Sequence, residues 1–87
     1  MSTVEEVKAG LAGAIEEANN AVGQARAATE AADRMIVRLR AVAQGTNHPK
    51  TQEAIAKAQQ CKQRLAEAST LARAAAQAAR DYIGILG

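Results

Sequence analysis

Three side chains in this sequence could take part in chemistry, and each of their types occurs once: His48, Cys61 and Tyr82. Histidine titrates near neutral pH and binds metals, and a cysteine thiolate is a nucleophile. One histidine and one cysteine are too few for the usual structural zinc site, and a lone cysteine excludes an internal disulfide. We therefore interpret His48 as a loop residue or helix cap, Cys61 as a small apolar filler, and Tyr82 as an anchor or a partner contact.

The rest of the chain holds little that could support catalysis. It has no Ser-His-acid set, no glycine-rich phosphate loop, no Cys-x-x-Cys and no His-x-x-x-His. The adjacent carboxylates Glu16 and Glu17 fall on the outer face of a predicted helix. The sequence thus predicts a protein that is not an enzyme, with no catalytic, cofactor-binding or metal-binding residues.

Composition and charge narrow the class further. The chain has 87 residues, a formal net charge of +2 and no phenylalanine or tryptophan. About a quarter of it is alanine, which favours helix and fits a bacterial source with a GC-rich genome. No segment is long and apolar enough to span a membrane. The acidic start, "MSTVEEVKAG", does not read as a signal peptide, so we expect a cytoplasmic protein.

Basic residues follow the second half of the chain, where they could contact phosphates. They alternate with Glu53, Glu67 and Asp81 and have no stacking aromatics, so a solvated face is the better interpretation than a nucleic-acid groove. The basic set is Lys50, Lys57, Lys62, Arg64, Arg73 and Arg80.

A first helix is predicted over about residues 3–44. Ser2 and Thr3 are each followed three residues later by a glutamate, which is a capping-box signature. Apolar residues then alternate at spacings of three and four. The predicted seam is Val4, Val7, Leu11, Ala14, Ala18, Ala21, Ala25, Ala28, Ala32, Met35, Leu39 and Val42, and Ile15, Val22 and Ile36 widen it. An alternative places a turn in the Asn19–Gly23 segment, "NNAVG", and gives three helices.

The turn is predicted at about residues 45–48. Gly45 suits the left-handed position just past a helix end. Thr46, Asn47 or His48 can cap the next helix, and Pro49 suits its first turn. The second helix is predicted over about 49–83. Its seam is Ala54, Ala58, Cys61, Leu65, Ala68, Ala72, Ala75, Ala79, Tyr82 and Leu86, with Ile55, Ala76 and Ile83 on one edge and Leu71, Ala78 and Ile85 on the other.

So short a connection makes the two helices antiparallel neighbours, with residue n roughly opposite residue 95 minus n. The predicted fold is therefore an all-α, coiled-coil-like hairpin with an alanine-rich seam, in a single domain over residues 1–87. Its apolar stripe is wider than one partner helix can cover, which predicts dimerisation into a four-helix bundle or binding of another helical protein. The candidate interface residues are Val4, Val7, Leu11, Ile15, Val22, Ile36, Leu71, Tyr82, Ile83, Ile85 and Leu86.

In plan, the chain resembles the WXG100 (ESAT-6-like) family of small helical-hairpin proteins, whose members form four-helix dimers, many of them secreted as folded pairs. Two motifs of the family are absent. The turn, Gln44-Gly45-Thr46, has the glycine but no tryptophan, and Leu86 stands four residues after Tyr82, where the secretion pattern has an acid. The resemblance implies the hairpin and the dimer, and it carries over no functional residue.

The sequence therefore predicts a non-enzymatic association module that forms a homodimer or one half of a hetero-complex. A second hypothesis is a regulatory module that captures an amphipathic helix or an apolar ligand between its helices. A third is a weak binder of nucleic acid or an anionic surface through the basic second helix.

Overall fold

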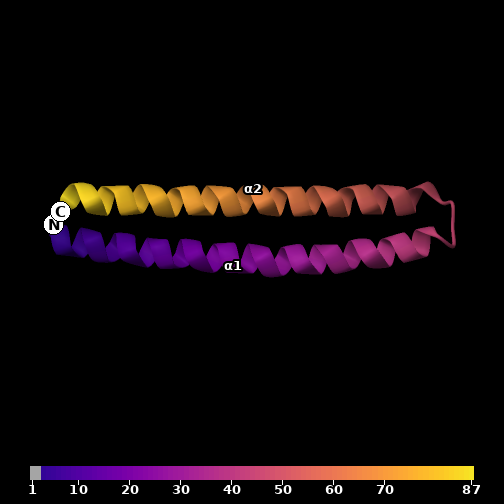
Figure 1. Ribbon diagram of the computed structural model, residues 1–87, viewed down its shortest axis with the longest axis horizontal. Helices are drawn as coiled ribbons and strands as arrows, with labels where there is room; N and C mark the ends of the chain where they lie inside the picture. Colours follow the sequence, from indigo (N-terminus) through magenta and orange to yellow (C-terminus); the bar gives the residue numbers. More distant parts are fainter. Residues whose placement is uncertain (1–2) are drawn as a thin grey trace.

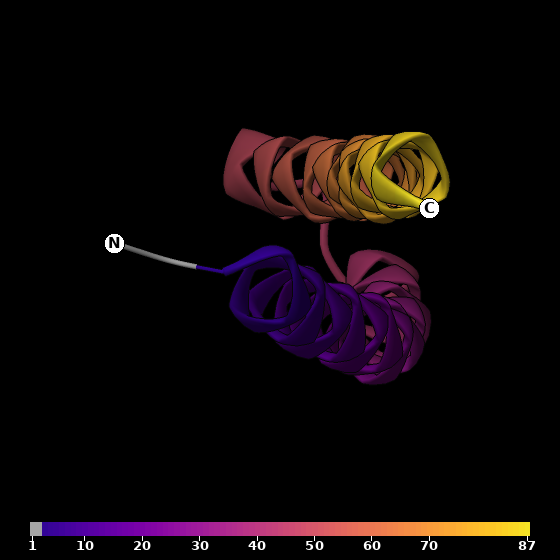
Figure 2. The ribbon, with the colours of Figure 1, turned by 90° about the vertical axis from the view of Figure 1, so that its left-hand side faces the viewer.

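The computed structural model describes residues 3–87, which form two long helices joined by a short turn. Helix α1 spans Val4–Ala43 and α2 spans Pro49–Leu86. Figure 1 shows the two helices antiparallel and side by side, and the view along the long axis in Figure 2 shows them as a single pair. The molecule is a rod that measures 63 × 19 × 14 Å. The prediction of an all-α helical hairpin is confirmed.

The start of α1 follows from its capping residues. Thr3 has an extended backbone, and its Oγ1 accepts a hydrogen bond from the backbone N–H of Glu6 at 3.1 Å. Glu5 and Glu6 then place two carboxylates in the first turn, beside the positive end of the helix dipole. The other half of the predicted signature, Ser2, lies outside the described residues.

We expect Thr3→Ala to lower the free energy of unfolding by about 1 kcal/mol, because the N–H of Glu6 loses its acceptor. Urea unfolding followed by circular dichroism measures the change. Thr70→Ala is the matched control, since the Thr70 hydroxyl only donates to the carbonyl of Ala66 in the interior of α2. Alanine there has the higher helix propensity, so the control is expected to lose nothing. Equal losses in both variants would contradict the capping assignment.

Helix α1 continues without interruption through Asn19–Gly23. The alternative of three helices is therefore wrong. The poor helix formers in this segment are tolerated because helical stability in proteins comes mainly from packing of one face rather than from propensity. Ala18, Val22 and Ala25 keep that face in contact with α2 on both sides of the asparagines.

The turn closes differently from the sequence prediction. Gly45 does not adopt the left-handed conformation, because the only positive φ among the described residues is that of Gly87. Helix α1 instead ends with Gln44 in the right-handed region, and the N–H of Gly45 donates to the carbonyl of Val42 at 2.9 Å. This tightened last turn satisfies a terminal carbonyl without a left-handed residue.

His48 caps α2, one of the three capping residues that the sequence allows. Its Nδ1 accepts a hydrogen bond from the N–H of Lys50 at 3.1 Å, and Pro49 occupies the first helical turn. The Thr51 hydroxyl donates to the His48 carbonyl at 2.7 Å. The imidazole therefore has a structural role at the start of the second helix.

The open end of the hairpin is also tied together. Helix α2 runs to Leu86, three residues beyond the predicted end at about 83, because Gly84 is accommodated within the helix. Gly87 then caps it with a φ of 89°. The Lys8 ammonium donates to the Gly87 carbonyl at 2.6 Å, which links the first turns of α1 to the end of α2.

The register between the helices agrees with the prediction. Lys8 contacts Gly87, and the Lys62 ammonium lies 2.5 Å from a carboxylate oxygen of Asp33. The residue numbers of each pair add to 95, so residue n lies opposite residue 95 minus n at two places far apart along the rod. Both members of the Asp33–Lys62 pair are partly exposed, so the pair fixes geometry more than it adds stability.

The seam differs from the predicted one by one residue in half of its positions. From Leu11 to Ala43, the buried and half-buried residues recur at alternating spacings of four and three, and they include Ile15, Val22 and Ile36. The predicted series that contains Ala14, Met35 and Val42 is wrong, because those side chains are exposed. In α1 the observed seam is Leu11, Ile15, Ala18, Val22, Ala25, Thr29, Ala32, Ile36, Leu39 and Ala43.

Helix α2 shows the same one-residue difference. Cys61, Ala68, Ala75 and Tyr82 of the predicted series are exposed, and their successors in the chain face α1. The α2 seam is Thr51, Ile55, Ala58, Lys62, Leu65, Ser69, Ala72, Ala76, Ala79, Ile83 and Leu86. The seam is thus less rich in alanine than predicted, because isoleucines and a leucine alternate with the alanines.

Only a thin core results from this packing. Among the described residues, Ile36 is the only large side chain that is buried, and the others are alanines: Ala25, Ala32, Ala58 and Ala76. Within residues 3–87, no side chain is more than 98% buried. Burial stabilises by about 25 cal/mol per Å² of apolar surface, so alanines contribute little each. The hairpin alone is a marginal fold for its size.

Candidate interaction surface

The structure divides the predicted interface residues into two groups. One group is buried or half-buried and lies along the contact between the two helices of the same chain: Val7, Leu11, Ile15, Val22, Ile36, Ile83 and Leu86. The other group faces solvent: Val4, Leu71, Tyr82 and Ile85. The first group contributes to the contact between the two helices, and the second group is exposed and free for contacts outside the chain. Val7 is only half-buried and lies at the edge of that contact.

An exposed apolar strip runs along one side of the hairpin. From Ala14 onward, each of its residues comes immediately before a seam residue in the sequence, and every second seam residue has one. We call it the apolar flank. It includes the exposed large side chains Met35, Val42 and Tyr82 and no charged residue. The apolar flank consists of Val7, Ala14, Ala21, Ala28, Met35 and Val42 in α1 and Ala54, Cys61, Ala68, Ala75 and Tyr82 in α2. Apart from Val7 and Ala54, which are half-buried, all are exposed.

The two halves of the apolar flank lie on the same side of the rod. Antiparallel helices are related by an approximate two-fold axis perpendicular to the plane that contains both of them. Rotation about this axis exchanges the helices but keeps each face on its own side. Equivalent positions in α1 and α2 therefore share a face, and the flank is continuous over both helices.

The opposite side of the seam is polar. A shallow groove there is lined by Asp33, Arg40, Gln59 and Lys62 together with the edge of Ile36. A second groove further along includes Arg26, Thr29, Ser69 and Arg73. In both helices, the residues of these grooves that lie outside the seam come immediately after a seam residue in the sequence, and they lie together on this side of the rod. The hairpin therefore has one polar and one apolar side.

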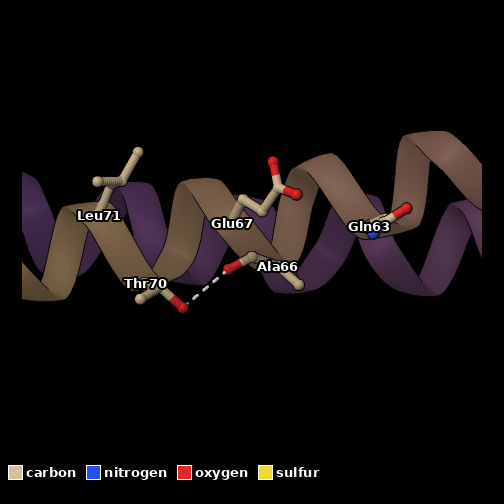
Figure 3. Close-up of a pocket in the computed structure, with 5 residues that line it drawn as sticks. All are labelled: Gln63, Ala66, Glu67, Thr70 and Leu71. Carbon is tan, nitrogen blue, oxygen red and sulfur yellow. Dashed lines mark hydrogen bonds between the residues drawn. The ribbon is translucent and has the colours of Figure 1, made fainter.

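Leu71 extends the apolar flank outward on α2. Figure 3 shows Leu71 and Thr70 at opposite edges of α2, with the Glu67 side chain turned toward the same edge as Leu71 and α1 behind the helix. Leu71 is 69% exposed. Ile85 lies two heptads further along the same edge of α2 and is 79% exposed. The concavity drawn in Figure 3 is lined by one helix only, so it is a dent in the outer surface of α2. Leu71 and Ile85 widen the apolar surface beyond what α1 can reach.

Of the single-copy residues, Cys61 and Tyr82 both lie in the apolar flank and are exposed. No cluster of three or more His, Cys, Asp or Glu side chains able to hold a metal ion occurs within residues 3–87. The basic residues of α2 do not share a face. Lys62 packs in the seam, Arg73 lies on the polar side, and Lys50 pairs with Glu53 at 2.8 Å.

The exposed area of the chain is large for its mass. A compact monomer of 9.0 kDa typically exposes about 4,900 Å², whereas this chain exposes 6280 Å². The excess of about 1,400 Å² reflects the rod shape.

Sequence reasoning assigned Met35, Val42 and Cys61 to the intramolecular seam and so missed their place on the free surface. The signal that distinguishes the two series is the position of the isoleucines. The isoleucines Ile15, Ile36, Ile55 and Ile83 all belong to the observed seam, and large aliphatic side chains gain more from burial than alanine does.

Within residues 3–87, neither helix contains a segment apolar enough to cross a membrane. Comparisons of the chain with models of protein families, with curated proteins and with solved structures find no match.

Proposed function

We propose that this protein is a non-enzymatic association module, which works by packing its apolar flank against another helical surface. The observation that carries the proposal is the contrast between the two sides of the seam. In the part of the chain that the structure describes, the intramolecular core contains one large buried side chain, Ile36, while the apolar flank leaves Met35, Val42 and Tyr82 exposed. Covering the flank adds apolar burial that the hairpin lacks on its own.

The proposed complex is a four-helix bundle of the coiled-coil type, either a homodimer or a hetero-complex with a second helical hairpin. The likeness in plan to WXG100 proteins agrees with such a complex and remains a prediction. The proposal assigns no chemical step to the chain. The Nδ1 atom of His48, the one imidazole, is engaged in capping α2, and Cys61 lies among alanines of the flank.

Light scattering and circular dichroism on the same dilution series test the proposal. We expect a mass above that of one chain at high concentration, and we expect helicity and mass to fall together on dilution, because association and folding are linked by mass action. A monomer whose helicity and unfolding midpoint do not depend on concentration would contradict the proposal, since such a hairpin needs nothing on its flank.

A further inference from the structure

We propose that the partner on the apolar flank is a second copy of this chain, packed so that the turn of each copy lies beside the open end of the other. This inference rests on the proposed function and adds the identity and the direction of the partner. Its first support is the order of side-chain sizes along the flank on α1. Side-chain sizes there run large, small, small, small, large, large from Val7 to Val42.

We place the two-fold axis level with the midpoint between Ala21 and Ala28. Ala21 of one copy then lies on Ala28 of the other, Ala14 on Met35, and Val7 on Val42. Small residues meet at the centre, where helix axes can approach to about 8 Å, each Met35 meets an alanine, and valines meet near the two ends. The flank is therefore complementary to itself, as a two-fold interface requires.

Two hairpins can stack by the same face in two symmetric ways. In one, the turns lie at opposite ends and each helix packs on its own counterpart. In the other, the turns lie at the same end and α1 of each copy packs on α2 of the other. Neighbouring helices are antiparallel in both, so helix dipoles do not distinguish the two arrangements.

The charged residues that border the flank do distinguish them. Arg38 and Lys57 each precede a flank residue by four positions, and their numbers add to 95, so they lie at the same height on the rod. With the turns together, Arg38 of each copy lies against Lys57 of the other. Like charges placed together across an interface are strongly unfavourable. With the turns apart, Arg38 instead meets the stretch around Gly10.

The same arrangement suits the outer edge of α2. Lys57 then lies near Ile85 of the other copy, so its aliphatic stem covers an exposed apolar side chain. Leu71 lies close to the midpoint of the rod and meets Leu71 of the other copy. This arrangement therefore covers Leu71 and Ile85, the most exposed large side chains of α2, and buries no unpaired charge beside them.

Charge along the whole rod favours the same direction. Residues 24–70, the half nearer the turn, carry eight Lys and Arg against four Asp and Glu, a net charge of +4. The remaining residues carry three basic and five acidic side chains, a net charge of −2. Placing the turn of one copy beside the open end of the other brings the positive half of each against the negative half of its partner.

Cross-linking between copies tests the direction. The protein is prepared as Cys61→Ala carrying Ala14→Cys and Met35→Cys, with the two single-cysteine variants as controls. Positions 14 and 35 are exposed and lie about 30 Å apart on one helix, so a disulfide between them cannot form within a chain. In the proposed dimer, position 14 of one copy faces position 35 of the other.

On mild oxidation we expect the double variant to shift to twice the chain mass on a non-reducing denaturing gel, and the single variants to stay at one chain mass. A double variant that is dimeric by light scattering but does not cross-link, or single variants that cross-link equally well, would overturn the direction and leave the association intact. A concentration-independent monomer would overturn both proposals.

Discussion

Ile36→Ala is expected to lower the free energy of unfolding by about 2–4 kcal/mol, because it removes the one large side chain that the hairpin buries. Ile36 is 5% exposed and lies roughly opposite Ala58, which is 3% exposed. The alanine at position 58 cannot expand into the space, so the cavity persists. For a fold of this size, such a loss is a large share of the total stability.

The neighbouring residue provides the control for this prediction. Val37 is 66% exposed, and Val37→Ala is expected to change the stability by less than about 0.5 kcal/mol. Urea unfolding of both variants at one protein concentration measures the difference. An equal loss in the free energy of unfolding at positions 36 and 37 would show that α1 does not pack on α2 through the face that contains Ile36.

Leu71→Glu is expected to weaken self-association by about 100-fold or more, since a buried hydrophobic anchor is replaced by a charge that meets its own copy across the two-fold axis. Leu71 is 69% exposed in the isolated hairpin, so the substitution leaves the intramolecular seam intact. Sedimentation or light scattering over a dilution series gives the change in dissociation constant.

Val37→Glu is the matched control for this second effect. Val37 is exposed to nearly the same extent as Leu71 but borders the polar side, where it adjoins Asp33 and Arg40. We expect its dissociation constant to stay within about threefold of the unaltered chain. If both glutamate variants weaken association equally, the effect comes from net charge and the apolar flank is not the interface.

Local signals in the sequence were sufficient for the two helices, the position of the turn and the register. The capping threonine and the proline after His48 mark the helix starts, and the short connection makes the helices antiparallel. The geometry that closes the turn was not predicted, because Gly45 is not left-handed. Register follows from the connection alone, because a short turn between long helices leaves no freedom to slide. The Asp33–Lys62 contact confirms it.

The rotation of each helix about its axis was harder to predict, because the polar residues of the seam conceal its pattern. The sequence offered an unbroken apolar series one residue away, while the observed series is interrupted by Thr29, Lys62 and Ser69. Thr29 fits because its hydroxyl donates to the Ala25 carbonyl at 2.8 Å. Lys62 fits because its stem lies along the seam and its ammonium reaches Asp33.

The candidate surface could not be separated from the core by periodicity for the same reason. An intramolecular contact and an intermolecular one both need apolar residues at spacings of three and four. The two series lie one residue apart, and both are rich in alanine. Only the few isoleucines indicate which series is the intramolecular seam and which is the exposed flank. Leu71 and Ile85 were identified as interface candidates because they lie outside either series.

The meeting of both helix ends at one tip, held by the bond from Lys8 to Gly87, has a consequence for attached cargo. Any fusion partner joined before residue 3 or after residue 87 projects from the same pole, and the far pole stays bare. In the proposed dimer the two poles belong to different copies. Two tethered domains would then be held apart by the full 63 Å length of the rod, which acts as a spacer of fixed size.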